Sequence, residues 1–186
     1  MNENFSKELT ALAETDLSVR EKLAATGALF NGYHPEMERV HKANAKRLRE
    51  IIAEIGFPTI ANIGEEGSEA AWLIIQHSIA EPEFMKECYQ RMVENSRDIN
   101  PKHRAYLYDR IKVFQSMPQK YGTQISSDGR LYPVEDKSKV NEERINVTLP
   151  PLSPDVISKI PEAEQIPEID ARDSEYMIWR KKVGWI

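Results

Sequence analysis

The spacing of hydrophobic positions predicts a chain built mainly from helices. Between Pro35 and Ile55, most apolar residues recur at steps of three or four, which is the period of one helix face. Asn44 falls on this face and interrupts it, and Gly56 with Pro58 ends the helix. The first thirty residues favour one or two short helices, because leucines recur along a charged background. The N-terminal third of the chain is therefore expected to be helical.

The segment 68–80 has a different pattern, with apolar residues on nearly every side of a helix. A helix that is apolar all round is usually the central, buried one. Pro82 marks the start of a clean amphipathic helix. Asn100 and Pro101 then provide an N-cap and a first-turn proline for a helix that is expected to run to about Met117.

The periodicity changes after Pro118. Two short runs around Asp128-Gly129 predict a small β-hairpin or extended element near residues 121–134. Five prolines beyond Leu149 argue against a long helix, so that the tail is expected to be an extended linker or wrapping arm. Its apolar end, with Trp179 and Trp185, is expected to dock on the body or on a partner.

These patterns predict a mainly α fold with a helical, bundle-like core, the small element at 121–134 and an extended C-terminal tail. Three parts are expected. Residues 1–33 form N-terminal helices, residues 34–158 form a core helical domain with the polar site, and residues 159–186 form a C-terminal arm. Exchange of this arm between subunits would give a homo-oligomer, and the sequence leaves that open.

Composition excludes several classes of function. The 186 residues include 25 Lys and Arg against 30 Asp and Glu, and a net charge of −5 argues against a nucleic-acid binder with a broad basic face. The single cysteine excludes a disulfide framework and a multi-cysteine zinc site. The longest apolar run, 70–75, is far short of the roughly 20 residues that span a bilayer. The N-terminus lacks a secretory signal, so no membrane partner and a cytoplasmic location are expected.

Arg110 is a charged residue in the middle of an apolar helix face, with Asp109 at the edge of that face. A guanidinium there is unfavourable unless it is paired or hydrated. One interpretation is a structural ion pair with a buried carboxylate. The other is a residue in a cleft that binds a carboxylate or phosphate in a forked geometry.

Gln76 and His77 are polar residues on the helix that is expected to be most buried. A lone histidine on an apolar face is in most cases a core residue hydrogen-bonded to a carbonyl. If Asp109 and Arg110 converge on it, His77 is expected instead to be a general acid or base, with Asp109 setting its tautomer.

The loop 119–124 follows the helix that carries Asp109 and Arg110. It offers two side-chain amides, a phenol, a hydroxyl and a glycine at which a ligand could approach the backbone. It is interpreted either as a polar turn with an aromatic anchor or as a loop that binds substrate.

No metal site is assigned from the sequence. His34, Glu38 and His41 have helix-like spacing, but the stretch has the pattern of a solvated helix face. His77 and Asp109 could supply two ligands to an ion, and no third ligand is visible.

The order of these motifs resembles that of a family of small, mostly bacterial proteins known as a domain of unknown function. The resemblance rests on a Gln-His pair, an Asp-Arg pair and a Gln-x-Tyr-Gly-Thr-Gln run, and it spans roughly Arg47 to Leu152. The N-terminal helices and the tail after Ile157 fall outside it. The chain has Phe57 where the family usually has Trp, and Ser116 near a usual Gly. The resemblance implies one shared polar site and no particular reaction.

Two functions are carried forward. The first is a small, soluble, cofactor-independent enzyme that acts by acid–base chemistry on a small anionic substrate, as a hydrolase or lyase. Its expected catalytic residues are His77, Asp109 and Tyr121, and its expected substrate-binding residues are Arg110, Gln76, Gln119, Thr123 and Gln124. The alternative is a non-catalytic module that binds a metabolite or another protein, as an accessory or immunity protein does.

Overall fold

The structure is a computed structural model that describes residues 2–30, 32–126, 129–163 and 174–186. It confirms the predicted mainly helical fold. The chain divides into two compact units, Met1–Ile99 and Asn100–Ile186. The three-part division expected from the sequence stays a prediction. None of the described helices is both long enough and apolar enough to span a membrane.

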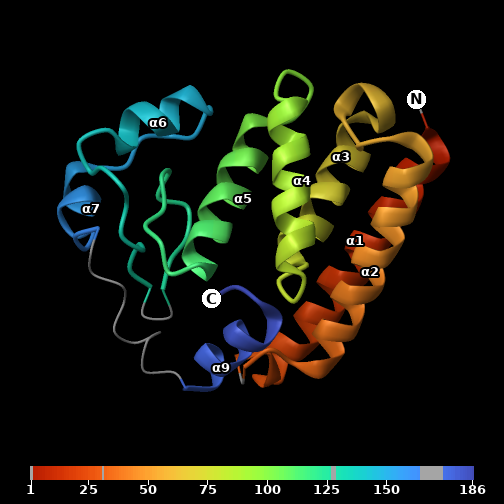
Figure 1. The fold of residues 1–186 in the computed structure, drawn as a ribbon, viewed down its shortest axis with the longest axis horizontal. Coiled ribbons are helices and arrows are strands. Elements are labelled where there is room, and N and C mark those ends of the chain that lie inside the picture. Colours follow the sequence, from red (N-terminus) through yellow and green to blue (C-terminus); the bar gives the residue numbers. More distant parts are fainter. Residues whose placement is uncertain (1, 31, 127–128, 164–173) are drawn as a thin grey trace. The chain divides into compact units, whose positions relative to one another are not determined.

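The first unit is entirely helical in its regular structure (Figure 1). Its elements are α1 (Glu3–Ala25), a 3-10 turn η1 (Ala28–Phe30), α2 (Pro35–Ile55), α3 (Ile60–His77) and α4 (Pro82–Glu94). Helix α1 is one continuous helix, where the sequence predicted one or two short ones. It packs mainly against α3 and also against α2, and α3 contacts α4.

Helix α3 is the buried helix that its apolar pattern predicted. Ile63, Ala71, Ile74 and Ile75 are each at most 1 % exposed. The helix starts earlier than the predicted 68–80 segment, because Thr59 accepts a hydrogen bond from the Asn62 N–H at its N-terminus, and it is kinked at Gly64, whose φ of 81° is not helical. It ends at His77, and the Ser78 hydroxyl then donates to the Ile74 carbonyl. His77 therefore lies in the last turn of a buried helix.

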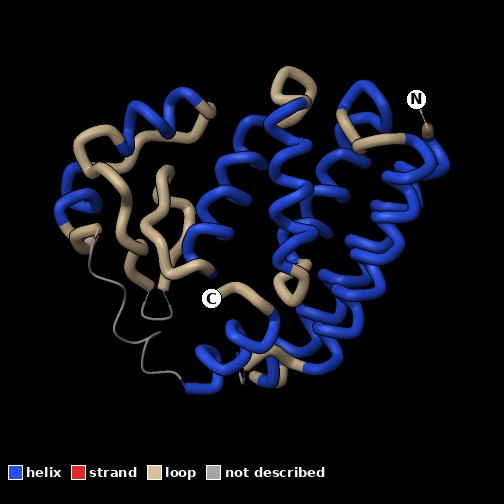
Figure 2. The backbone as a smooth tube through the Cα atoms, viewed as in Figure 1, coloured by secondary structure: helices blue, strands red, loops and turns tan. Residues whose placement is uncertain are grey.

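The second unit contains α5 (Pro101–Phe114), α6 (Val140–Asn146), α7 (Pro154–Ser158) and α9 (Ser174–Val183). Helix α5 ends three residues before the predicted Met117. Between residues 119 and 134, the described residues form two isolated bridges, Gln119 with Val134 and Ile125 with Leu131, and no regular strand (Figure 2). An extended element is therefore present, while Asp128 of the predicted turn lies outside the described residues.

The apolar C-terminal end docks within the second unit, as one of the two sequence interpretations expected. The Arg180 guanidinium of α9 donates to the Phe114 carbonyl at 3.0 Å and to the Ser116 hydroxyl at 2.9 Å. Trp185 is 4 % exposed and stacks on the Phe114 ring with a centroid distance of 4.9 Å. These contacts satisfy carbonyl groups at the end of α5 that lack a partner inside the helix. Residues 164–173 of the predicted arm lie outside the described residues.

One polar contact ties α1 to α2 inside the first unit. The Asn44 side-chain amide donates to the Leu12 carbonyl at 3.2 Å. Asn44 lies one turn after His41 on α2, and Leu12 lies one turn before Asp16 on α1. We expect Asn44→Ala to lower the free energy of unfolding by about 1 kcal/mol, because a buried hydrogen bond is lost. Urea unfolding measures this change. The exposed Lys46→Ala variant is the control, and an Asn44→Ala variant as stable as that control would contradict the prediction.

Candidate functional site

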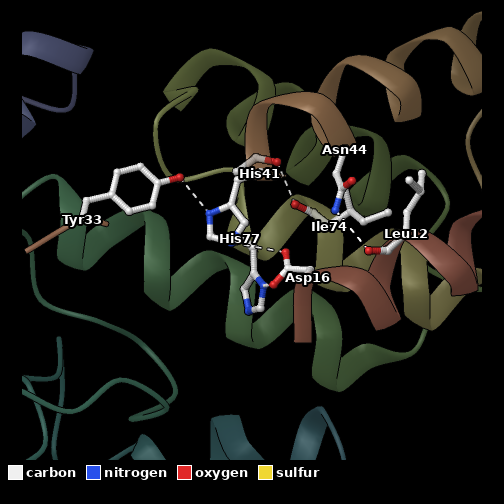
Figure 3. Close-up of polar contacts among 8 residues, drawn as sticks. Leu12, Asp16, Tyr33, His41, Asn44, Ile74 and His77 are labelled. Atoms are coloured by element: carbon white, nitrogen blue, oxygen red, sulfur yellow. Dashed lines mark hydrogen bonds and ion pairs between the residues drawn. The ribbon is translucent and has the colours of Figure 1, made fainter. Parts of the chain in front are cut away.

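Three helices of the first unit bring a carboxylate and two imidazoles together (Figure 3). Asp16 lies on α1, His41 on α2 and His77 at the end of α3. Asp16 Oδ1 is 2.9 Å from His77 Nδ1, and Asp16 Oδ2 is 3.2 Å from His41 Nε2. The two imidazole centroids are 5.2 Å apart. We call Asp16, His41 and His77 the His–Asp–His cluster.

The helical period places these polar groups in the interior. Asp16 follows buried Leu9 and Ala13 at steps of four and three, on the face of α1 that packs into the unit. His41 follows buried Met37 by one turn on the corresponding face of α2. Helix packing then sets the three side chains against one another, although they are 25 or more residues apart along the chain.

Burial differs among the members of the His–Asp–His cluster. The side chains of Asp16 and His41 are 1 % and 7 % exposed, whereas that of His77 is 16 % exposed. Burial by itself would raise the pKa of Asp16, but its close polar contacts with His41 and His77 lower it well below its usual range. Asp16 is therefore an ionised carboxylate, and His77 is the member with most access to solvent.

Tyr33 extends the cluster on the far side of His41. Its hydroxyl lies 2.7 Å from His41 Nδ1, and the two rings stack with centroids 5.7 Å apart. Burial, followed by the negative charges of Glu38, Asp16 and Glu81, raises the pKa of Tyr33. A neutral phenol can donate to a bare Nδ1 or accept from a protonated one. Tyr33 thus accommodates either tautomer of His41.

The cluster also has the composition of a metal site. Each of its three residues offers one ligand atom, and these atoms lie within 4.8 Å of one another. Two nitrogens and one carboxylate oxygen are ligands that zinc-class ions accept.

The residues predicted from the sequence fall in both units. Gln76 and His77 lie on α3 of the first unit, and Gln76 is buried. Asp109 and half-buried Arg110 lie on α5 of the second unit, and Gln119, Tyr121, Thr123 and Gln124 follow α5 in that same unit. The carboxylate that contacts His77 directly is that of Asp16 on α1, and the tautomer-setting role expected of Asp109 stays a prediction.

Asp109 instead organises the loop that follows its own helix. Its side chain is fully buried and accepts backbone hydrogen bonds from Lys120 at 2.8 Å, Tyr121 at 3.0 Å and Thr123 at 3.0 Å, together with the Thr123 hydroxyl at 2.9 Å. Burial raises the pKa of Asp109 to about 6, while these hydrogen bonds act in the opposite direction.

Gln119 performs a similar task within the same loop. Its side-chain oxygen accepts from the Gln124 N–H at 2.8 Å, and its side-chain amide donates to the Gln124 and Tyr132 carbonyls at 3.0 Å each. Arg144 adds donors to the Tyr121 and Gly122 carbonyls. The structure therefore brings together five residues that the sequence singled out. Side-chain hydrogen bonds that shape the loop involve four of them: Asp109, Gln119, Thr123 and Gln124. Tyr121 takes part through its backbone N–H, which donates to Asp109.

Sequence reasoning missed Asp16 and Tyr33 and misjudged His41. The prediction of a solvated helix face is wrong for His41, which is 6 % exposed. His34 serves as the N-cap of α2, where its Nδ1 accepts from the Glu36 N–H. A usable signal was present: Asp16 and His41 both occupy apolar helix faces, the same rule violation that drew attention to His77.

Comparison with known proteins gives one match. A model described as a family of unknown function, DUF6624, matches residues 3–165. This range is wider than the resemblance at 47–152, and it includes α1 with Asp16. Neither a curated protein nor a solved structure matches the chain significantly.

Proposed function

Because the chain belongs to DUF6624, a family of unknown function, we propose a function from the chemistry of its own residues: an enzyme that moves a proton at a small anionic substrate, in a hydrolase- or lyase-type reaction. His77 is the proposed acid–base group and Asp16 is its positioning residue. This keeps the reaction class that the sequence suggested and moves its centre to the first unit.

The contact between Asp16 and His77 carries the proposal. A buried, ionised carboxylate at 2.9 Å from Nδ1 holds a proton on that nitrogen and leaves the lone pair of the neutral ring on Nε2. That nitrogen is the basic atom of the ring. After it takes a proton, Asp16 stabilises the imidazolium, and so does the negative end of the α3 dipole, since His77 lies in the last turn.

An anionic substrate fits the form of the cluster in which His77 is the acid. One carboxylate serves two imidazoles, so that the His–Asp–His cluster carries a net positive charge in the form in which both rings are protonated. The substrate-binding roles predicted for Arg110 and for the loop 119–124 stay predictions, and the proposal for His77 does not depend on them.

The test is a screen of the full chain against chromogenic phosphate monoesters and carboxylate esters. We expect turnover of at least one compound, and a loss of at least 100-fold in kcat/KM for His77→Gln, because general acid–base catalysis contributes about that much or more. Asp16→Asn is expected to lower kcat with little change in KM, because it acts through His77.

His103→Gln is the matched control, since His103 is a half-buried histidine of the second unit outside the cluster. Circular dichroism establishes that each variant is folded. A folded His77→Gln variant with the rate of the natural chain would refute the role of His77. A chain that turns over no compound while binding small anions would favour the non-catalytic metabolite-binding module.

A further inference from the structure

We infer that Asp16, His41 and His77 together bind a divalent transition-metal ion of the zinc class. The inference rests on the same cluster as the proposed function and deepens it by naming the group that would polarise water or substrate there.

The donor set fits a catalytic ion. Two imidazole nitrogens and one carboxylate oxygen resemble the three-ligand sets of catalytic zinc, which leave a further position for water or substrate. Ions such as Mg²⁺ and Ca²⁺ prefer oxygen ligands, and two imidazoles disfavour them. The set therefore selects for zinc-class ions over magnesium and calcium.

The spacing of the donors fits the same ions. Ligand bonds of about 2.0–2.1 Å in tetrahedral geometry place two donor atoms roughly 3.3 Å apart. Asp16 Oδ1 and His77 Nδ1 are 2.9 Å apart, and Asp16 Oδ2 and His41 Nε2 are 3.2 Å apart. All three ligand atoms lie within 4.8 Å of one another, so the more distant donors would move closer together on binding one ion.

Two buried atoms lack the partner that an ion would supply. Asp16 Oδ2 and His41 Nε2 are shielded from solvent, and neither has a hydrogen bond of good geometry among the described residues. Their 3.2 Å contact is an ion pair that is not aligned as a hydrogen bond. Buried polar atoms without such bonds are uncommon in native proteins, and a role in binding an ion is one of the recognised causes.

Tyr33 supplies the support that metal-binding histidines usually have. A coordinating imidazole commonly donates its other ring N–H to an oxygen, which fixes its tautomer and orientation. Tyr33 places its hydroxyl oxygen 2.7 Å from His41 Nδ1, so Nε2 is the nitrogen left to bind the ion.

An ion bound here would take over the acid–base work, because His77 Nδ1 could not both coordinate the ion and carry the proton that Asp16 holds in the ion-free chain. A coordinated water loses its proton far more readily than bulk water, and an open coordination position attracts an anionic group. The cluster would then bind an anion through the ion and present a hydroxide close to it.

The experiment measures metal binding directly, and an activity assay of the same samples separates this inference from the proposed function. The full chain is stripped with a chelator and titrated with Zn²⁺ by calorimetry and with Co²⁺ by its visible absorption, which reports on nitrogen and oxygen ligands. We expect one ion per chain.

Loss of a ligand should weaken the affinity for the ion at least 100-fold, in each of the variants His41→Ala, His77→Ala and Asp16→Asn. Tyr33→Phe should weaken it about tenfold, which is the usual effect of removing a supporting residue. His103→Ala is the control and should bind as the natural chain does, and Mg²⁺ should not compete.

Circular dichroism identifies variants that fail to fold. If a variant of one of the three ligands does not fold, Tyr33→Phe still tests the site. Absence of Zn²⁺ and Co²⁺ binding in the natural chain, or binding that survives loss of His41 and His77, overturns the inference. Turnover by a chain that binds neither Zn²⁺ nor Co²⁺ overturns the metal inference and leaves the proposed function standing. Binding of one ion through the three ligands, with no turnover of any compound, supports the metal inference and contradicts the proposed function.

Discussion

Asp109→Ala is expected to destabilise the second unit by about 4 kcal/mol, because it removes the buried acceptor of several backbone N–H groups at once. Without the carboxylate, the amides of Lys120, Tyr121 and Thr123 lose the partner that the loop geometry gives them. Each buried donor left without a partner costs about 1–3 kcal/mol, and partial rehydration of the loop limits the sum.

Urea unfolding of the full chain measures the total change, and hydrogen exchange at the three amides locates it. The matched control is Asp136→Ala, because Asp136 is an exposed aspartate that accepts one backbone bond from Ser138. Its change should stay below about 1 kcal/mol. If Asp109→Ala is no more destabilising than this control, the loop does not depend on the carboxylate.

Asp16→Ala is expected to lower the stability of the ion-free chain by about 3 kcal/mol at neutral pH. The substitution leaves His41 and His77 beside an apolar methyl group in place of a buried carboxylate, and breaking a buried ionic network has effects of this size. Thermal unfolding in the presence of a chelator separates this effect from that of any bound ion. The exposed Asp155→Ala variant of α7 serves as the comparison.

The pH dependence of the Asp16→Ala effect has a definite sign. The folded-state pKa of Asp16 lies below its ordinary value of 3.8, so the contribution of its carboxylate to stability is fully present above pH 3.8. It declines as the pH falls below that value toward the folded-state pKa. The difference in stability between the natural chain and Asp16→Ala should therefore shrink as the pH falls below 3.8. A difference that grows as the pH falls below 3.8 would show that Asp16 is not an ionised partner of the histidines.

Much of the fold was predictable because helix formation leaves a local record. The steps of three and four in α2, and the all-round apolar pattern of α3, identified both helices and the burial of the second. Their ends were less predictable. Helix α3 begins at Ile60, because a hydrogen bond to Thr59 and the Asp98 carboxylate at the Ala61 N–H start it before the apolar run.

The candidate site was predictable only in part. His77 stood out as a polar residue on a buried helix, and that reasoning depends on one helix alone. Its carboxylate partner was sought on α5, whereas Asp16 of α1 makes the contact. Which carboxylate contacts His77 depends on which helix faces meet. A single sequence carries no direct record of contacts between residues that are 61 positions apart.

The amino-acid sequence by itself determined the mainly helical character, the burial of α3 and the polar exception at His77, because each follows from periodicity and from the cost of burying a polar group. Tertiary structure alone decided that Asp16 and His41 accompany His77 and that Asp109 shapes a loop. Side chains far apart along the chain meet through the packing of helices, and the direction in which a helix packs depends on all of its neighbours together.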